Sequence, residues 1–151
     1  MGKGCFATCY EVTSRATGRA YCAKKLPKAR PRQTAQRCLA AINDEVRILR
    51  QLQHCEDVLQ ICGVIDGPDY VYIITELCRG GTLADHLRDA GPLTESQAAH
   101  ALRSILSAIN ACHCAGIEYG VSGAGEHGEG DSLWNFEVSS RASPAATLEL
   151  L

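Results

Sequence analysis

A glycine-containing stretch at the start of the chain has the residue types that can hold a phosphate group. Gly2 and Gly4 are separated by one residue, and a backbone without Cβ atoms can approach a bulky anionic ligand closely. The free N–H groups of such a segment can point at phosphate oxygens. An aromatic residue, Phe6, follows, and Lys24 supplies a matching positive charge further along. Together these residues indicate a phosphate-binding site far more specifically than glycines alone.

Composition limits the class of protein. The chain has 151 residues, enough for one domain with a core, and its 15 Lys and Arg nearly balance its 17 Asp and Glu. This balance gives no reason to expect nucleic acid or a membrane surface as a partner, and no apolar run is long enough to span a bilayer. The nine cysteines follow no signal-peptide segment, so we interpret them as reduced thiols in a cytoplasmic protein. The tight cluster at 112–114 lacks further ligands for zinc, so we expect no metal site.

The elements that position these residues follow from the apolar pattern. Two strands, 9–13 and 20–26, are joined by a polar turn, and Lys24 lies on the second strand. A helix is predicted over 34–52, where apolar residues recur every three or four positions. Glu45 lies at the edge of its buried stripe. From periodicity alone we favour a solvated residue there, with an ion pair to a lysine of the sheet as the alternative.

The elements after residue 57 are predicted from turn residues, capping residues and the apolar pattern. A second hairpin is predicted from turn residues at 66–69 between two runs rich in valine, isoleucine and tyrosine. Thr82 can cap a short helix, and Thr94 opens a capping box. The predicted ranges are strands 58–65 and 70–77, a helix over 83–90, and a helix from the capping box to 113 or 114. The long helix carries on one side Ala98, Leu102, Ile105, Leu106, Ile109 and Cys112. The glycine-rich residues 119–151 are predicted to be mostly disordered, with a short helix near the end.

This order of elements resembles the first half of a eukaryotic protein kinase domain, over about residues 2–118. The resemblance implies an α+β fold. Residues 1–78 would form an N-terminal lobe, a twisted antiparallel sheet with one helix, and 79–118 the first two helices of a truncated C-terminal lobe. The chain looks most like calcium/calmodulin-dependent and plant-type calcium-dependent serine/threonine kinases at 16–21, 74–81 and 111–113. It also resembles polo-like kinases at 2–7 and 26–28.

The resemblance also implies roles for individual residues. Lys24 would hold the α- and β-phosphates of ATP and pair with Glu45, which makes the ion pair the expected state of that glutamate. Thr75 would guard the back of the adenine pocket, and backbone groups of Glu76 and Cys78 would bind adenine. The complete set implied to bind the nucleotide is Gly2, Lys3, Gly4, Cys5, Phe6, Ala7, Cys9, Ala23, Lys24, Glu45, Thr75, Glu76 and Cys78.

The sequence departs from the family's pattern at both ends. After the matching segment 113–117, residues 118–121 stand where the family has His-Arg-Asp, followed by a downstream Asn and Asp-Phe-Gly. The catalytic aspartate and both positions that bind Mg²⁺ in the family are therefore missing. The sequence His-Leu-Arg-Asp at 86–89 contains an inserted leucine and has no asparagine at the family's spacing, so we assign it no catalytic role. Met1 directly precedes Gly2, which leaves out the family's first strand.

We therefore expect the ATP-binding portion of a serine/threonine protein kinase domain, which binds ATP weakly or not at all and transfers no phosphate as this chain alone. Two alternatives stay open. One is a pseudokinase-like module that presents its surface to a protein substrate or a regulatory protein. The other is a non-functional fragment of a kinase gene.

Overall fold

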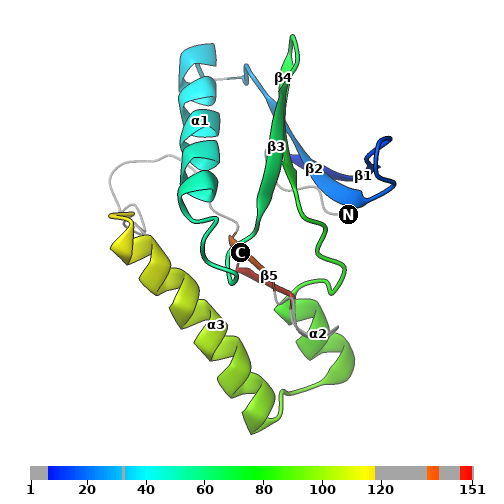
Figure 1. Cartoon of the computed structure of the whole chain (residues 1–151), viewed down its shortest axis with the longest axis vertical. Coiled ribbons are helices and arrows are strands. Elements are labelled where there is room, and N and C mark those ends of the chain that lie inside the picture. Colours follow the sequence, from blue (N-terminus) through cyan, green and yellow to red (C-terminus); the bar gives the residue numbers. More distant parts are fainter. Residues whose placement is uncertain (1–6, 32, 118–135, 140–146, 151) are drawn as a thin grey trace.

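The computed structural model describes residues 7–31, 33–117, 136–139 and 147–150. A four-stranded sheet and α1 form one half of the molecule, and α2 and α3 lie together below them (Figure 1). The elements in chain order are β1 (Thr8–Thr13), β2 (Ala20–Pro27), α1 (Ala35–Gln51), β3 (Ile61–Asp66), β4 (Tyr70–Thr75), α2 (Leu83–Ala90), α3 (Glu95–Cys114), β5 (Phe136–Ser139) and β6 (Thr147–Leu150). Among the described residues, no helix is both long and apolar enough to cross a membrane.

The sheet has the strand order β1-β2-β4-β3, and all neighbouring strands are antiparallel. Its β-branched and aromatic residues suit a pleated surface. Gly18 closes the turn between β1 and β2 with a φ of 68°, a conformation that glycine adopts without strain. In the β3–β4 hairpin, the Gly67 N–H donates to the Tyr70 carbonyl over 2.9 Å. The two predicted hairpins are therefore present.

The core of the upper half lies between the sheet and α1. Side chains alternate between the faces of a strand, and Leu26, Val71 and Ile73 point toward α1 and are 2%, 5% and 0% exposed. Ile42 and Val46 of α1 complete this cluster because helical periodicity places them on one side. The predicted helix is confirmed, with its two outermost predicted residues serving as the N-cap and the C-cap.

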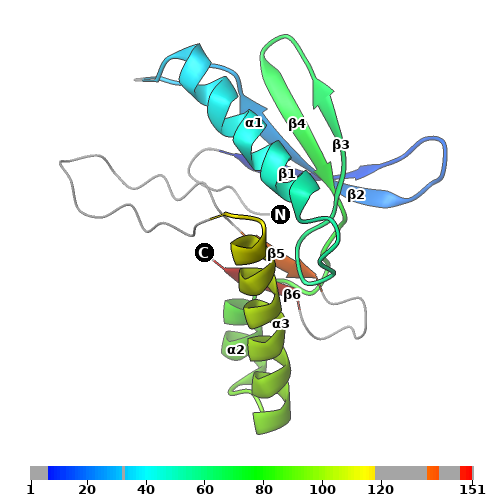
Figure 2. The same cartoon turned by 60° about the vertical axis from the view of Figure 1, so that its left-hand side comes forward.

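A second cluster joins the two halves of the molecule. The end of α1 and the loop after it contribute Ile48, Leu52 and Val58, and α3 contributes small residues that include Ala108 and Ala111. Figure 2 shows the C-terminal end of α3 near the C-terminal end of α1. The position of α3 relative to the sheet is therefore set by the last turns of two helices and the loop between α1 and β3.

The start of β3 differs from the predicted one for an identifiable reason. β3 begins at Ile61, although the apolar run begins at Val58. Val58 and Leu59 are 1% and 9% exposed within the connection, where the Gln60 side-chain amide donates to the carbonyls of Cys55 and Val58. Apolar character there reflects core packing and not a strand.

The end of the chain also differs from expectation. Thr147–Leu150 is extended and pairs with Phe136–Ser139, so the short terminal helix predicted there is wrong. The backbone groups of this segment bond to a neighbouring strand and not within a helix. Other residues of 119–151 lie outside the described part of the chain, and their disorder stays a prediction.

Candidate functional site

Lys24 and Glu45 form an ion pair on the face of the sheet that α1 covers. The Lys24 Nζ lies 2.7 Å from the Glu45 Oε1, and the two side chains are 21% and 10% exposed. Lys24 comes from β2, an inner strand, and Glu45 comes from the middle of α1. The second oxygen, Oε2 of Glu45, is buried and has no hydrogen-bond partner among the described residues. The solvated position favoured by periodicity alone is wrong, and the ion pair implied by the resemblance is present.

The register of the sheet shows which residues share a face with Lys24. Cys9 is paired with Lys24, so it lies on the same face. Cys22 precedes Lys24 by two residues and also shares its face, whereas Ala23 is paired with Tyr10 and Ile74 on the opposite face. Ala23 was assigned to the nucleotide site from the resemblance, but its position on the strand turns it away. Cys22, which shares the Lys24 face, was not among the residues assigned from the sequence, although the two-residue period of a strand could have placed it there.

The segment after β4 is held by hydrogen bonds to the loop before β3. Thr75 is 4% exposed, and its hydroxyl donates to the Glu76 carbonyl over 3.1 Å. The Glu76 N–H donates to the Gln60 carbonyl over 3.0 Å, and the Glu76 side chain accepts from the Gln60 N–H over 2.9 Å. These bonds fix where the Glu76 carbonyl lies. Its oxygen has two lone pairs, so it can accept a second hydrogen bond.

One contact near this segment was not predicted from the sequence. The Arg79 Nη2 lies 2.6 Å from the Glu11 Oε1 of β1, and the two side chains are 67% and 44% exposed. The partners are 68 positions apart in the chain. A pair that joins a strand to a distant loop leaves no signal in local sequence spacing.

Two groups of sequence-assigned residues remain to be placed. Gly2, Lys3, Gly4, Cys5 and Phe6 lie outside the described residues, as does 118–121, where the family has its catalytic aspartate. Ala7 is described and packs against the cluster under α1.

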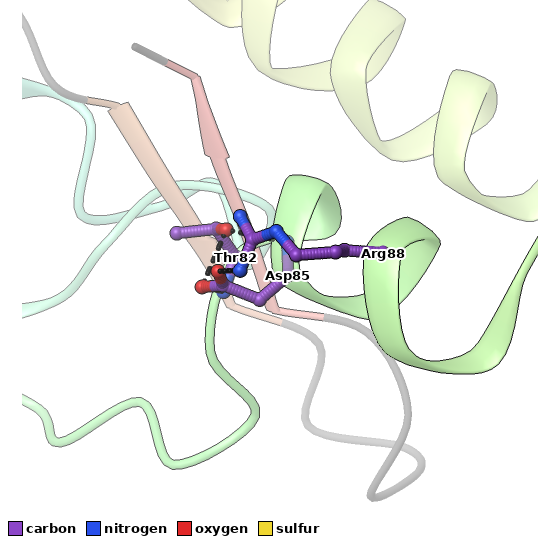
Figure 3. A network of polar contacts seen from close by, with 3 residues as sticks. All are labelled: Thr82, Asp85 and Arg88. Atoms are coloured by element: carbon purple, nitrogen blue, oxygen red, sulfur yellow. Dashed lines mark hydrogen bonds and ion pairs between the residues drawn. The ribbon is translucent and has the colours of Figure 1, made fainter.

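The His-Leu-Arg-Asp segment lies within α2, where its arginine supports the start of the helix (Figure 3). The Thr82 hydroxyl accepts from the Asp85 N–H over 2.9 Å, and the Asp85 carboxylate accepts from the Thr82 N–H over 3.2 Å. Arg88 donates to the other Asp85 oxygen over 2.8 Å. Hydrogen bonds from Thr82, and then from Arg88, lower the pKa of Asp85. This network is a helix cap.

Metal ligands are not grouped in the part of the chain that the structure describes. No set of three or more His, Cys, Asp or Glu side chains there could hold a metal ion. The described residues therefore do not fit the Mg²⁺ site that the family uses, and we derive no step through the metal.

Residues 1–120 match the protein kinase domain family, and the chain therefore belongs to this family. It is 34% identical over 117 residues to calcium-dependent protein kinase 5 of Oryza sativa subsp. japonica, covering 78% of this chain and 21% of that protein. It is 32% identical over 120 residues to calcium-dependent protein kinase SK5 of Glycine max, covering 78% of this chain and 23% of that protein. The chain thus spans less than a quarter of the length of these two relatives.

A solved structure shows the same fold. The crystal structure of Rad53 1–466 in complex with AMP-PNP matches 78% of this chain and 29% of that chain, with a TM-score of 0.65 and 27% sequence identity. The predicted kinase-like α+β fold is therefore confirmed, as is the resemblance to plant calcium-dependent kinases.

Proposed function

We propose that this chain is the ATP-binding portion of a serine/threonine protein kinase domain and that it transfers no phosphate on its own. The observation that carries the proposal is the ion pair between Lys24 and Glu45, at 2.7 Å on the α1 face of the sheet. In the family, such a lysine contacts the α- and β-phosphates, and the glutamate on the helix holds it in place.

The exposure of the pair supports this division of roles. Glu45 is 10% exposed and sits within the helix–sheet contact, so it can orient a cation but is poorly placed to meet a ligand. Lys24 keeps 21% of its side chain exposed, and an ammonium group has three donors. One donor reaches the carboxylate, and the others can reach phosphate oxygens. An ammonium fixed before the ligand arrives avoids part of the entropic cost of binding.

The adenine ring would lie between the sheet and the segment after β4. Cys9 and Cys22 share the Lys24 face and would contact the ring from the sheet side. The Glu76 carbonyl and the Cys78 N–H would provide hydrogen bonds along its edge. Thr75, buried at the end of β4, would limit how deeply a ligand enters.

Phosphate transfer needs more than this clamp. In the family, an aspartate positions the substrate hydroxyl, and carboxylate and amide side chains hold Mg²⁺. The sequence lacks the His-Arg-Asp and Asp-Phe-Gly motifs that supply these groups. The proposed activity is therefore nucleotide binding that gains little from Mg²⁺.

A titration of the full chain with a fluorescent N-methylanthraniloyl ATP, with and without Mg²⁺, tests the proposal. We expect saturable binding, little effect of Mg²⁺, and a loss of at least about tenfold in affinity for Lys24→Met, which removes a charge-assisted contact. Lys25→Met is the matched control. Its ammonium lies on the opposite face, 3.8 Å from the centre of the Tyr70 ring, and its affinity should stay within about twofold of wild type because it makes no phosphate contact. Equal losses for both variants, or no binding by the wild type, would contradict the proposal.

A binding module without nucleotide is the second candidate, and one observation favours it. On α3, Leu102, Leu106 and Ile109 are 55%, 56% and 40% exposed, and exposed apolar side chains grouped on one helix are common at interaction surfaces. The partner would be a protein substrate or a regulatory protein. The same titration separates the candidates, because this module predicts no saturable binding of the ATP analogue.

A further inference from the structure

The contact between Glu11 and Arg79 lies at the edge of the proposed nucleotide site. Glu11 follows Cys9 by two residues on β1, so both side chains point to the Lys24 face of the sheet. In the register, Glu11 is paired with Cys22, and Cys22 is paired with Thr75 at the end of β4. Arg79 follows four residues after Thr75.

The ion pair therefore closes a ring. Two ladder pairings join β1 to β2 and β2 to β4, the chain continues from the end of β4 to Arg79, and the 2.6 Å contact returns to Glu11. Arg79 has to reach past β2, because β1 and β4 are separated by about two strand spacings of roughly 4.8 Å each. The segment that would bind adenine forms part of this ring.

We infer that the Glu11–Arg79 pair is a clasp at the outer edge of the nucleotide site, which holds β1 against the segment after β4 and slows the release of bound nucleotide. This inference rests on the proposed function and adds a residue pair that controls residence time. Both side chains are largely exposed, so the clasp opens readily, and salt weakens it by screening.

Dissociation rates test the clasp. The full chain is loaded with N-methylanthraniloyl ATP, and release is followed after mixing with excess ATP at low salt. We expect Glu11→Gln and Arg79→Gln each to release the analogue about twofold to fivefold faster, the range that an exposed ion pair supports. The double variant should be no faster than either single one, because the two partners act as a unit. High salt should speed release from the wild type more than from the double variant, because both share the screened Lys24–phosphate contact and only the wild type also has the Glu11–Arg79 pair.

Two further variants distinguish the clasp from the electrostatic effect that each charge alone would have on the anionic nucleotide. By field alone, removing the Glu11 charge would strengthen the binding of an anionic nucleotide, and removing the Arg79 charge would weaken it. The clasp predicts faster release in both cases, and the combined exchange Glu11→Arg with Arg79→Glu should return the rate to within about twofold of wild type, because it restores the pair at unchanged net charge. Asp66→Asn is the control, since it breaks the Lys28–Asp66 pair, also at 2.6 Å, at the other end of the sheet.

The results that would contradict the clasp differ from those that would contradict the proposed function. Binding that depends on Lys24, combined with wild-type release rates in Glu11→Gln, Arg79→Gln and the charge exchange, would overturn the clasp and leave the proposed function standing. Changes of opposite sign in the two single variants would also overturn it. If the wild type binds no analogue, the proposed function fails and the clasp fails with it.

Discussion

The two long helices of this chain meet their surroundings in opposite ways. α1 lays large apolar residues against the sheet, and Ile42 and Val46 are 3% and 9% exposed. α3 buries small residues, Ala101, Ala108 and Ala111, and leaves leucines such as Leu106 largely exposed. Both helices are amphipathic in sequence, but only α1 has a described partner that covers its large side chains.

This difference shows what helical periodicity can and cannot establish. The pattern predicts that one side of a helix is apolar, but it does not say which packing partner is present. For α1, the packing partner is the four-stranded sheet, and all of its strands lie in the described part of the chain. For α3, contact with the rest of the described fold uses small residues: Ala108 and Ala111 pack near the C-terminal end of α1, and Ala101 packs against Leu83 of α2. The half formed by the sheet and α1, which carries Lys24, is therefore the half in which sequence pattern and burial agree.

The largest expected effect tests this contrast directly. Ile73→Ala, at a side chain that is 0% exposed, should lower the free energy of unfolding by about 2–5 kcal/mol because it removes buried methyl groups and leaves a cavity. Leu106→Ala, at a side chain that is 56% exposed, should change it by less than about 0.5 kcal/mol. Urea unfolding followed by circular dichroism measures both. Similar losses in the two variants would show that α3 is covered after all, and the contrast between the helices would fail.

A smaller effect is expected at the ion pair between the sheet and α1. Lys24→Met leaves the Glu45 carboxylate, which is 10% exposed, without its cation. We expect the free energy of unfolding to fall by about 1–3 kcal/mol, less than for a fully buried pair because Lys24 is partly exposed. Adding Glu45→Leu should recover part of this loss, since no unpaired charge then remains. A further loss in the double variant would mean that Glu45 stabilises the fold by contacts other than the ion pair.

Much of the fold could be predicted from the sequence. Capping residues and turns identified α2, α3 and the two hairpins closely, because Thr82, Thr94 and Gly67 act through neighbours in the chain. The predicted start of a strand was wrong where a buried residue lies outside the strand, as at Val58 in the loop before β3. A buried loop residue and a strand residue look alike in sequence.

The candidate site was harder to predict from the sequence than the fold. The resemblance led to Lys24 and Glu45, which periodicity alone would have separated. It did not reveal that Ala23 faces away from Lys24, which follows from strand alternation. It also did not reveal Arg79 beside Glu11, because that contact depends on how a loop returns across the sheet. Local patterns predict elements, but contacts between distant segments depend on the assembled fold.

The smallest expected effect concerns α2, which has no fully buried residues and begins at a polar cap. The pKa of Asp85 is lowered in the folded chain, chiefly by its hydrogen bonds to Thr82. A lowered folded pKa means that the cap contributes stability above the unfolded pKa, which is about 3.9 for aspartate, and loses it as the pH falls through the folded value. Backbone amide shifts of Thr82 and Asp85, followed by NMR from pH 7 downward, should stay constant until about pH 4 and then move as the carboxylate is protonated.

Two variants on α2 complete this test. Asp85→Asn should remove the acid transition in the amide shifts, because the side chain no longer titrates there. Asp89→Asn, on the same helix but outside the cap, should leave it in place. An Asp85→Asn variant that keeps the transition would show that a carboxyl group other than Asp85 moves these amide shifts. The local polar cap would then not account for the acid response of α2, and the contrast with α1, which is stabilised by packing against the sheet, would lose this support.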